Sequence, residues 1–228
     1  MNYRPHTVAI LAMTADGKIA DFQRAAARFG SAHDKTHLEQ QISLVDGVLF
    51  GAATLRSYGT TMSVSNPILL QERRLRSQQP QPVQIVVSAS GDLDPQWRFF
   101  QQPVPRWLIT VPSGAESWRS QSGFERILIV HGTQENNSTI NWAATFAQLQ
   151  ELGLNKLAIL GGGELIASLL EVDLIDELWL TVCPLIFGGN APTPVGGKGF
   201  IQSQSKKLQL LAVKQVEQEV FLHYLVQK

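Results

Sequence analysis

The feature that most constrains the fold of this chain is a repeated alternation of short apolar runs with segments of helical spacing. The apolar runs are rich in valine, isoleucine and leucine, and each is short enough for a strand buried on both faces of a sheet. Because strands that alternate with helices pair in parallel, the sequence predicts an α/β fold with a mainly parallel sheet. The predicted strands occupy residues 6–13, 46–51, 83–88, 106–111, 125–132 and 156–160.

Helical segments are predicted between most of these strands. The Ser-, Gln- and Pro-rich stretch 62–82 is expected to be surface loop with one irregular helix. A long strand follows from residue 176, and the tail 207–228 divides into two strands that add an antiparallel edge. No repeat and no convincing linker is found, so we expect a single domain over residues 1–228. The other predicted helices cover residues 33–44, 53–59, 141–153 and 164–175.

Composition narrows the class of protein. The chain has 228 residues, of which 44% are hydrophobic, and its 19 basic and 19 acidic side chains leave a formal net charge of +0. A chain with this charge balance has no net positive charge to attract nucleic acid or an anionic membrane. Neither is therefore expected as a partner. The apolar stretch from Val8 to Met13 is too short for a signal or membrane segment, and no run approaches the ~18 apolar residues of a membrane span.

Cysteine and histidine usage argues against a metal site. The single cysteine, Cys183, excludes an internal disulfide and a site built from several cysteines. This usage fits a reducing compartment, and a cytoplasmic protein is expected. His33 and His37 are four residues apart but lack the glutamate of an HExxH zinc motif, so they are interpreted as part of a solvated helix face. No metal is therefore expected.

The run LAILGGGELIASLL, residues 157–170, places three glycines between an apolar strand and an amphipathic helix. In open parallel sheets, ligands bind beyond the carboxyl ends of the strands, where a helix N-terminus presents unpaired N–H groups to an anion. Glycines let a diphosphate approach the backbone closely, so the triplet predicts a diphosphate site; the alternative is a tight turn without a ligand. The dinucleotide fingerprint fails at Ile166, and the Walker A pattern fails at Phe200.

Three segments together resemble one known family. They are MTADGKIA at residues 13–20, DGVLFGAATL at residues 46–55 and LGGGELIASLLEVDLIDELWLTVCPLIFGGNAPTP at residues 160–194. In this order and spacing, the chain resembles the riboflavin-biosynthesis reductases of the RibD C-terminal family over nearly its whole length. The resemblance implies a dihydrofolate reductase-like fold, a single α/β domain whose twisted, mixed, mostly parallel sheet is flanked by helices. It also implies a homodimer that binds NADPH and reduces the sugar of an aminouracil ribosyl phosphate to a ribityl chain by hydride transfer.

The resemblance also assigns residues to the cofactor. The glycine triplet faces the cofactor diphosphate, and Thr54 matches a glycine-x-x-threonine motif that begins at Gly51. Ser88 falls where the family meets the adenosine 2′-phosphate, to which a serine hydroxyl can donate a hydrogen bond, and Ser90 is a second candidate. The cofactor-binding residues implied by the resemblance are Gly51, Thr54, Ser88, Gly161, Gly162, Gly163 and Glu164.

The substrate side is assigned to four residues. Lys18 follows the first strand, near the expected nicotinamide, and is the predicted catalytic residue, because an ammonium could hold a sugar hydroxyl, a phosphate or a developing negative charge. Asp16 is placed with the substrate or, alternatively, only shapes the turn. Ser31 is either a substrate contact or a helix cap. Asp34 lies where dihydrofolate reductase-like sequences place a substrate-contacting carboxylate.

Departures from the family concern the substrate side and leave two alternatives open. Leu160 replaces a glutamate before the triplet, residues 58–64 replace the motif DDPxLT, and the helix that ends in QQISLVDG lacks an arginine near its end. The predicted function is an NADPH-dependent reductase of the small-molecule aminouracil substrate. The alternatives are a pteridine or dihydrofolate-type reductase on the same fold and a non-catalytic NADPH-binding protein.

Overall fold

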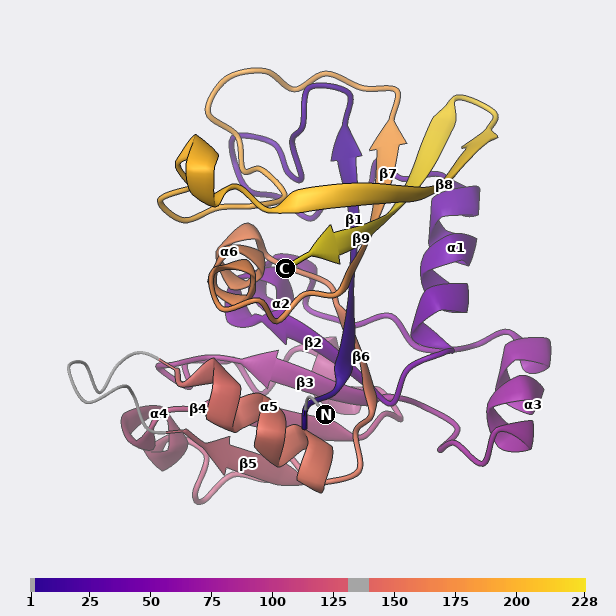
Figure 1. The fold of residues 1–228 in the computed structure, drawn as a ribbon. Helices are drawn as coiled ribbons and strands as arrows, with labels where there is room; N and C mark the ends of the chain where they lie inside the picture. The colour runs from indigo at the N-terminus through magenta and orange to yellow at the C-terminus, as the bar shows by residue number, and fades with distance from the viewer. Residues whose placement is uncertain (1–2, 131–139) are drawn as a thin grey trace.

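The computed structural model describes residues 3–130 and 140–228, which form one nine-stranded sheet with helices on both faces (Figure 1). None of the helices in these residues combines the length and the apolar character that crossing a membrane requires. The strands are β1 His6–Thr14, β2 Gly47–Gly51, β3 Val83–Val87, β4 Arg106–Thr110, β5 Arg126–Ile129, β6 Lys156–Ile159, β7 Glu177–Cys183, β8 Lys207–Val216 and β9 Glu219–Gln227. The α-helices are α1 Ala32–Ile42, α2 Ala52–Tyr58, α3 Pro67–Leu75, α4 Pro112–Glu116, α5 Trp142–Glu151 and α6 Gly163–Glu171, and 3-10 helices occur at Arg98–Gln101 and Gln202–Gln204.

The strand order across the sheet is β5-β4-β3-β2-β6-β1-β7-β9-β8. All pairs among strands β1 to β7 are parallel. Strand β9 runs antiparallel to both of its neighbours, β7 and β8. The predicted mixed, mostly parallel sheet with an antiparallel edge is thereby confirmed. Strand β6 inserts between β1 and β2. After β2 the chain continues to β3, on the side of the sheet that ends in β5. After β6 it continues to β7, on the side that ends in β8, so the two connections run in opposite directions across the sheet.

Each face of the sheet carries its own hydrophobic core, because successive residues of a strand point to opposite faces. In β1, Val8 and Ile10 belong to the cluster that contains Ile42 of α1 and Leu55 of α2. Ala9 and Leu11 belong to the opposite cluster, which includes apolar residues of α5 and α6. The central strands are thus covered on both sides, as their continuous apolar runs predict.

Some elements differ from the sequence-based expectation, and helix α4 has no predicted counterpart. The helix predicted over 164–175 ends at Glu171, because Asp173 adopts a left-handed φ of 57° and the Leu174 N–H returns to the Leu169 carbonyl at 2.9 Å. Leu174 and Ile175 are buried in the connection to β7 instead. Strand β5 ends at Ile129, and the last residues predicted for it, 131 and 132, lie outside the described residues.

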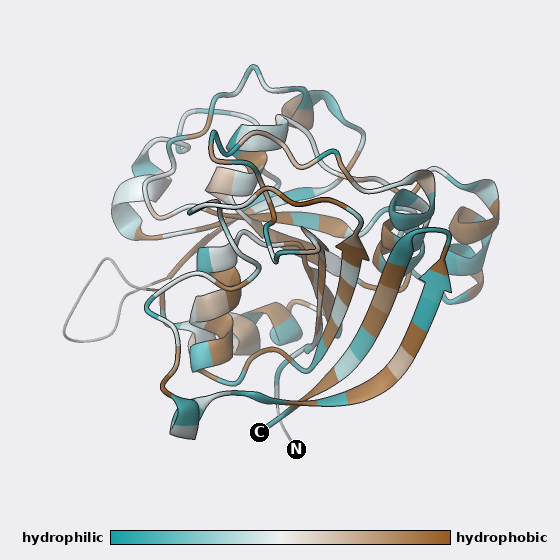
Figure 2. Ribbon diagram, turned by 90° about the horizontal axis from the view of Figure 1, so that it is seen from above, coloured by the Kyte–Doolittle hydropathy of each residue, from teal (hydrophilic) through white to brown (hydrophobic). Residues whose placement is uncertain are grey.

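The β8–β9 hairpin closes with a two-residue turn, because Val216 pairs with Glu219. Two-residue hairpin turns need a positive φ, which an asparagine–glycine pair usually provides. Here Glu217 adopts it, with a φ of 51°, so the sequence lacks the usual turn signal. Strand β8 forms the outer edge of the sheet, and Figure 2 shows apolar segments along it. Leu210 is 51% exposed and Val213 57% exposed. This edge therefore presents apolar side chains to solvent.

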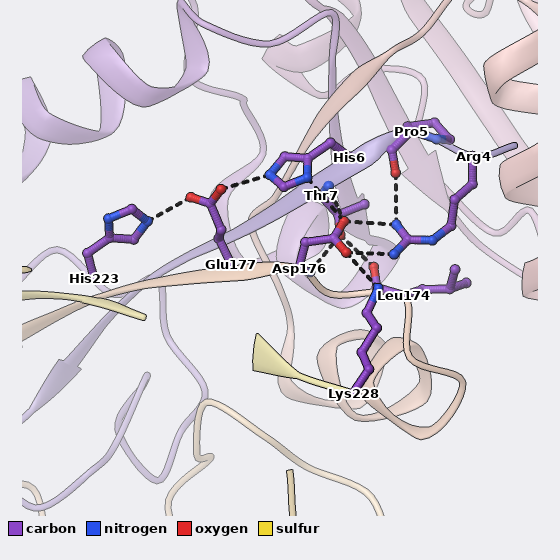
Figure 3. Close-up of polar contacts among 9 residues, drawn as sticks. All are labelled: Arg4, Pro5, His6, Thr7, Leu174, Asp176, Glu177, His223 and Lys228. Atoms are coloured by element: carbon purple, nitrogen blue, oxygen red, sulfur yellow. Dashed lines mark hydrogen bonds and ion pairs between the residues drawn. The ribbon is translucent and has the colours of Figure 1, made fainter. Parts of the chain in front are cut away.

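A charged network joins the start of β1, the start of β7 and the C-terminus (Figure 3). Asp176 accepts hydrogen bonds from the two guanidinium nitrogens of Arg4 at 2.6 and 2.9 Å, from Nζ of Lys228 at 2.7 Å and from the N–H of Thr7 at 2.9 Å. Glu177 bridges the imidazoles of His6 and His223. The network ties segments that are distant in the sequence at the end of the sheet opposite the carboxyl ends of the parallel strands.

Candidate functional site

The predicted site residues gather at the carboxyl ends of the parallel strands. Strands β2 and β6 are neighbours there, and the chain leaves them in opposite directions, which makes their junction a topological switch point. Ligands of open α/β sheets bind in the crevice at such a point. The sequence places a glycine motif after each of these two strands, at Gly51 and at the triplet 161–163.

Helices α2 and α6 begin side by side at this junction. Gly51 is the N-cap of α2 and Gly162 is the N-cap of α6, and neither helix has a side-chain cap. The Gly51 N–H donates to the Gly161 carbonyl at 2.9 Å. A Cβ atom on Gly162 would lie 3.4 Å from Oγ1 of Thr54, so the predicted contact residues Gly51, Thr54 and Gly162 lie together. Uncapped N–H groups beside a threonine hydroxyl suit an anion such as a diphosphate.

Each of the three positions in the triplet favours glycine for a different structural reason. Gly161 is buried and has a φ of +93°, which favours glycine. Gly163 packs against a loop, because a Cβ atom there would lie 2.6 Å from the Thr193 carbonyl oxygen. Only Gly162 combines partial exposure with space around its α-carbon, bounded by the Thr54 hydroxyl. A close approach of a ligand to the backbone is therefore possible at Gly162.

Glu164 and Ser88 make contacts within the protein. The Glu164 carboxylate accepts the Gly197 N–H at 3.0 Å and thereby holds the loop that covers Gly163. Ser88 follows β3, next to β2, and is 5% exposed, with its hydroxyl oxygen accepting the Gly91 N–H at 3.1 Å. Ser90 is exposed. Both serine hydroxyls keep a proton to donate.

Asp16 shapes the turn after β1 and anchors a second loop. One carboxylate oxygen accepts the Thr14 hydroxyl at 2.6 Å, and the two oxygens accept the N–H groups of Phe187 and Gly188. The Thr14 hydrogen bond is the main cause that lowers the pKa of Asp16 to about 2, and the two backbone donors lower it further. Lys18 follows in the same turn, where its N–H donates to the Thr14 hydroxyl and its side chain is half-buried.

Ser31 and Asp34 mark the start of α1 on the other side of β1. The Ser31 hydroxyl accepts the N–H groups of His33 and Asp34, so the helix-cap reading of Ser31 is confirmed. The Asp34 carboxyl group lies against Gly30, where a Cβ atom would collide with it. Burial is the largest cause that raises the pKa of Asp34; a hydrogen bond from Thr181 lowers it, and the charge of Glu219 raises it again.

Glu219 is a functional candidate that sequence reasoning missed. Its side chain, at the start of β9, is 4% exposed. It accepts the Ser31 N–H at 2.8 Å, the Ser31 hydroxyl at 2.5 Å and the Cys183 thiol at 3.5 Å. Burial and the neighbouring carboxylates raise the pKa of Cys183 to about 12, which suits a packing residue rather than a nucleophile. A glutamate beside a surface turn carries no sequence signal for burial.

A hollow of about 230 Å³ opens beside this carboxylate. Ser31 and Glu219 line it together with apolar residues that include Phe29 and Leu185. Its lining includes Ser31, a predicted substrate residue, and does not include Gly51, Thr54 or Gly162 of the glycine junction. In residues 3–130 and 140–228, no three histidine, cysteine, aspartate or glutamate side chains gather as metal ligands.

Comparison with known proteins shows which sequences share this chain's pattern. The RibD C-terminal domain matches residues 5–222. The 2,5-diamino-6-ribosylamino-4(3H)-pyrimidinone 5′-phosphate reductase of Methanothermobacter thermautotrophicus is 25% identical and covers 98% of this chain and 99% of its own length. The protein of the same name from Archaeoglobus fulgidus is 24% identical, over 87% of this chain and 90% of that one. The chain spans only 57% of the riboflavin biosynthesis protein RibD of Actinobacillus pleuropneumoniae, at 25% identity.

Solved structures with the same fold include a pyrimidine reductase-like protein of Corynebacterium diphtheriae, with a TM-score of 0.78, 20% identity and coverage of 98% of this chain and 92% of that one. The yeast riboflavin biosynthesis reductase Rib7 gives a TM-score of 0.72 at 15% identity, over 100% and 92%. Dihydrofolate reductase of Enterococcus faecalis gives 0.53 at 15% identity, over 98% and 97%. The pteridine-type alternative is not favoured, because the relatives that match nearly end to end are named as reductases of a ribosylaminopyrimidinone phosphate. The match over residues 5–222 shows that this chain belongs to the RibD C-terminal domain family, as an oxidoreductase of the riboflavin-biosynthesis type.

Proposed function

We propose that this protein uses NADPH to reduce the ribosyl group of an aminopyrimidine ribosyl phosphate to a ribityl chain. The observation that carries the proposal is the junction of Gly51 and Gly162, where two uncapped helix N-termini meet at the switch point of the sheet. The reductases that match nearly end to end add support, since their names specify such a substrate. Because those names give the diaminopyrimidinone form, we place that form first and the aminouracil form second.

The residues at the junction fit a dinucleotide. Gly51, Gly162 and Thr54 would receive the diphosphate, which gains about 0.3–1 kcal/mol from each favourable contact with a helix N-terminus. Ser90, exposed after β3, is better placed than the buried Ser88 to reach a 2′-phosphate. When bound, the cofactor supplies the hydride, and the protein supplies position and electrostatics.

The substrate side is proposed to lie between the turn after β1 and the start of α1. Lys18 offers an ammonium group at the end of β1, which would hold a sugar hydroxyl or the phosphate. Asp34 offers a half-buried carboxyl group, which would lie where the ribosyl group joins the pyrimidine. Asp16 is assigned to the turn, because both of its oxygens already accept hydrogen bonds within the chain.

NADPH oxidation with purified protein tests the proposal. Turnover with 5-amino-6-(5-phosphoribosylamino)uracil or with its 2,5-diamino-pyrimidinone counterpart, and none with dihydrofolate, is the expected result. Turnover with dihydrofolate alone would assign the protein to the pteridine-type alternative. Tight NADPH binding without turnover of any pyrimidine or pterin would identify a non-catalytic binding protein. The relative rates on the two pyrimidines decide which form is the substrate.

We further infer a homodimer that uses the outer edge of the sheet. In the β8–β9 ladder, Leu208, Leu210 and Val213 pair with Val226, Tyr224 and Leu222, so these six residues share one face. Their β8 members are 44%, 51% and 57% exposed. No charged side chain belongs to this set, so two copies related by a two-fold axis would bring no like charges together. A cytoplasmic location is proposed as well, on the basis of one buried, unpaired cysteine.

A further inference from the structure

A buried carboxylate that is not among the predicted site residues binds Ser31, a predicted substrate residue. Glu219 of β9 binds both the N–H and the hydroxyl of Ser31, at 2.8 and 2.5 Å. Ser31 in turn caps α1 and accepts the N–H of Asp34 at 3.3 Å. The first turn of α1, which carries Asp34, is therefore tied through Ser31 to the C-terminal hairpin.

Hydrogen-bond donors are distributed unequally between the two carboxyl groups. Glu219 accepts three donors, two from Ser31 and one from the Cys183 thiol. The Asp34 carboxyl group has one side-chain donor, the Thr181 hydroxyl. This carboxyl group is partly buried and lies near the charge of Glu219. Two neighbouring carboxyl groups in a poorly solvated place do not both ionise readily. Burial and the nearby Glu219 charge both raise the pKa of Asp34, so its surroundings favour the protonated form of this carboxyl group.

The proposed reaction requires such a proton. Reduction of a ribosyl amine to a ribityl chain breaks the bond between the anomeric carbon and the ring oxygen. The anomeric carbon takes the hydride, and the released oxygen takes one proton and becomes a hydroxyl group. An acid beside the sugar must supply that proton and regain it from solvent.

We propose that Glu219 is a positioning residue that, through Ser31, holds Asp34 beside the sugar as the acid of the reduction. This inference rests on the proposed function. Three titratable groups from different elements interact electrostatically with Asp34: Glu219 of β9, Cys183 of β7 and Tyr58 of α2. Burial raises the pKa of both Cys183 and Tyr58, so Glu219 is the neighbour whose charge acts on Asp34 near neutral pH.

Carboxyl ¹³C NMR tests the coupling without turnover. The Asp34 signal, assigned by its loss in Asp34→Asn, is expected to titrate at higher pH than exposed aspartates in the unmodified protein. In Glu219→Gln, which keeps the shape and an acceptor oxygen for Ser31, the titration should move to lower pH. Glu151→Gln, which removes an exposed charge on α5, should leave it unchanged. An ordinary Asp34 titration in the unmodified protein, or no movement in Glu219→Gln, would overturn the proposal.

Activity gives the second arm, once turnover of the pyrimidine ribosyl phosphate is established for the unmodified protein. Asp34→Asn should lower kcat by about 100-fold or more, as expected for loss of a general acid. In Glu219→Gln, the fall of kcat at high pH should begin at lower pH while KM changes little. Full kcat in Asp34→Asn would refute the acid role. An unmodified protein that binds NADPH but reduces no pyrimidine would refute the proposed function, and the NMR titration would still judge the Asp34–Glu219 pair.

Discussion

The backbone N–H of Gly51 donates to the carbonyl oxygen of Gly161 across 2.9 Å, and this bond joins the end of β2 to the segment after β6. It holds the first turns of α2 and α6 next to each other. Because the junction consists of backbone groups, its shape does not depend on side-chain rotamers. A cradle of this kind is already formed before a ligand arrives, which lowers the entropy lost on binding.

Gly162→Val is expected to weaken NADPH binding by about 5- to 30-fold, the equivalent of about 1–2 kcal/mol in lost anion contacts. The added side chain would enter the space beside Thr54, where its Cβ alone lies 3.4 Å from the hydroxyl. Fluorescence titration measures the affinity, with thermal melting to show that the variant is folded. Ala144→Val, at an exposed position of α5, should bind NADPH normally. Unchanged affinity in folded Gly162→Val would remove the main support for the diphosphate site.

Lys18→Met is expected to lower kcat/KM for the pyrimidine substrate by about 10- to 100-fold, because a charge-assisted hydrogen bond contributes roughly 1.5–3 kcal/mol. The substitution keeps the length and apolar part of the side chain and removes only the charge. NADPH affinity should stay within about twofold, since Lys18 is assigned to the substrate and not to the diphosphate. Steady-state kinetics provides the test, with Lys35→Met on the exposed side of α1 as the control. Equal loss in both variants would assign the effect to general charge.

Most of the fold was predictable because strands that are buried on both faces of the sheet appear in the sequence as continuous apolar runs. The runs that became β1, β2 and β6 are continuous and apolar, and the antiparallel edge followed from two consecutive strands at the C-terminus. The end of α6 was not predictable, because residues 172–175 keep an apolar pattern that serves a buried connection as well as a helix.

The site was predictable where backbone chemistry decides and unpredictable where tertiary contacts decide. The glycine motifs predict that a ligand can approach the backbone closely, and in the structure Gly51 and Gly162 lie together. Glu219 gives no such signal, because its role depends on a partner, Ser31, that is 188 residues away. The sequence allows Asp16 to be a substrate ligand or a turn residue, and its hydrogen bonds to the loop at 187–188 become visible only in the structure.

Asp16→Asn is expected to loosen the loop at Phe187 and Gly188, whose N–H groups the carboxylate accepts. Amide hydrogen exchange at these two residues should be faster in the variant. In the unmodified protein, the folded pKa of about 2 lies below the usual 3.8, so the contribution of Asp16 is complete above about pH 4 and lost as the pH falls through about 2. Protection of the two amides that persists unchanged at pH 2 would contradict this assignment.

Asp176→Asn is expected to lower the free energy of unfolding by about 2–3 kcal/mol, because it leaves the partly buried guanidinium of Arg4 without its charged partner. Burial alone would raise the pKa of Asp176, but hydrogen bonds from Arg4, Lys228 and Thr7 hold it well below its usual 3.8. The stabilisation is therefore present above pH 3.8 and declines as the pH falls below it. Urea unfolding at pH 7 measures the loss. Lys228→Gln, which removes the more exposed partner, should cost at most about 1 kcal/mol, and an equal loss in both variants would argue against the Arg4 pair as the main contact.

Leu210→Lys is expected to convert the proposed homodimer into a monomer, because it places a charge within the apolar face that β8 shares with Tyr224 and Leu222. Burying an unpaired ammonium at such an interface should raise the dissociation constant by about 100-fold or more. Size-exclusion chromatography with light scattering, over a range of protein concentrations, measures the mass. The matched control is Lys214→Glu, which changes a charge on the opposite face of the same strand, beside Phe221, and should leave the mass unchanged. A dimer that survives Leu210→Lys but separates in Lys214→Glu would place the interface on the other face of the hairpin, and a monomeric unmodified protein would refute the dimer itself.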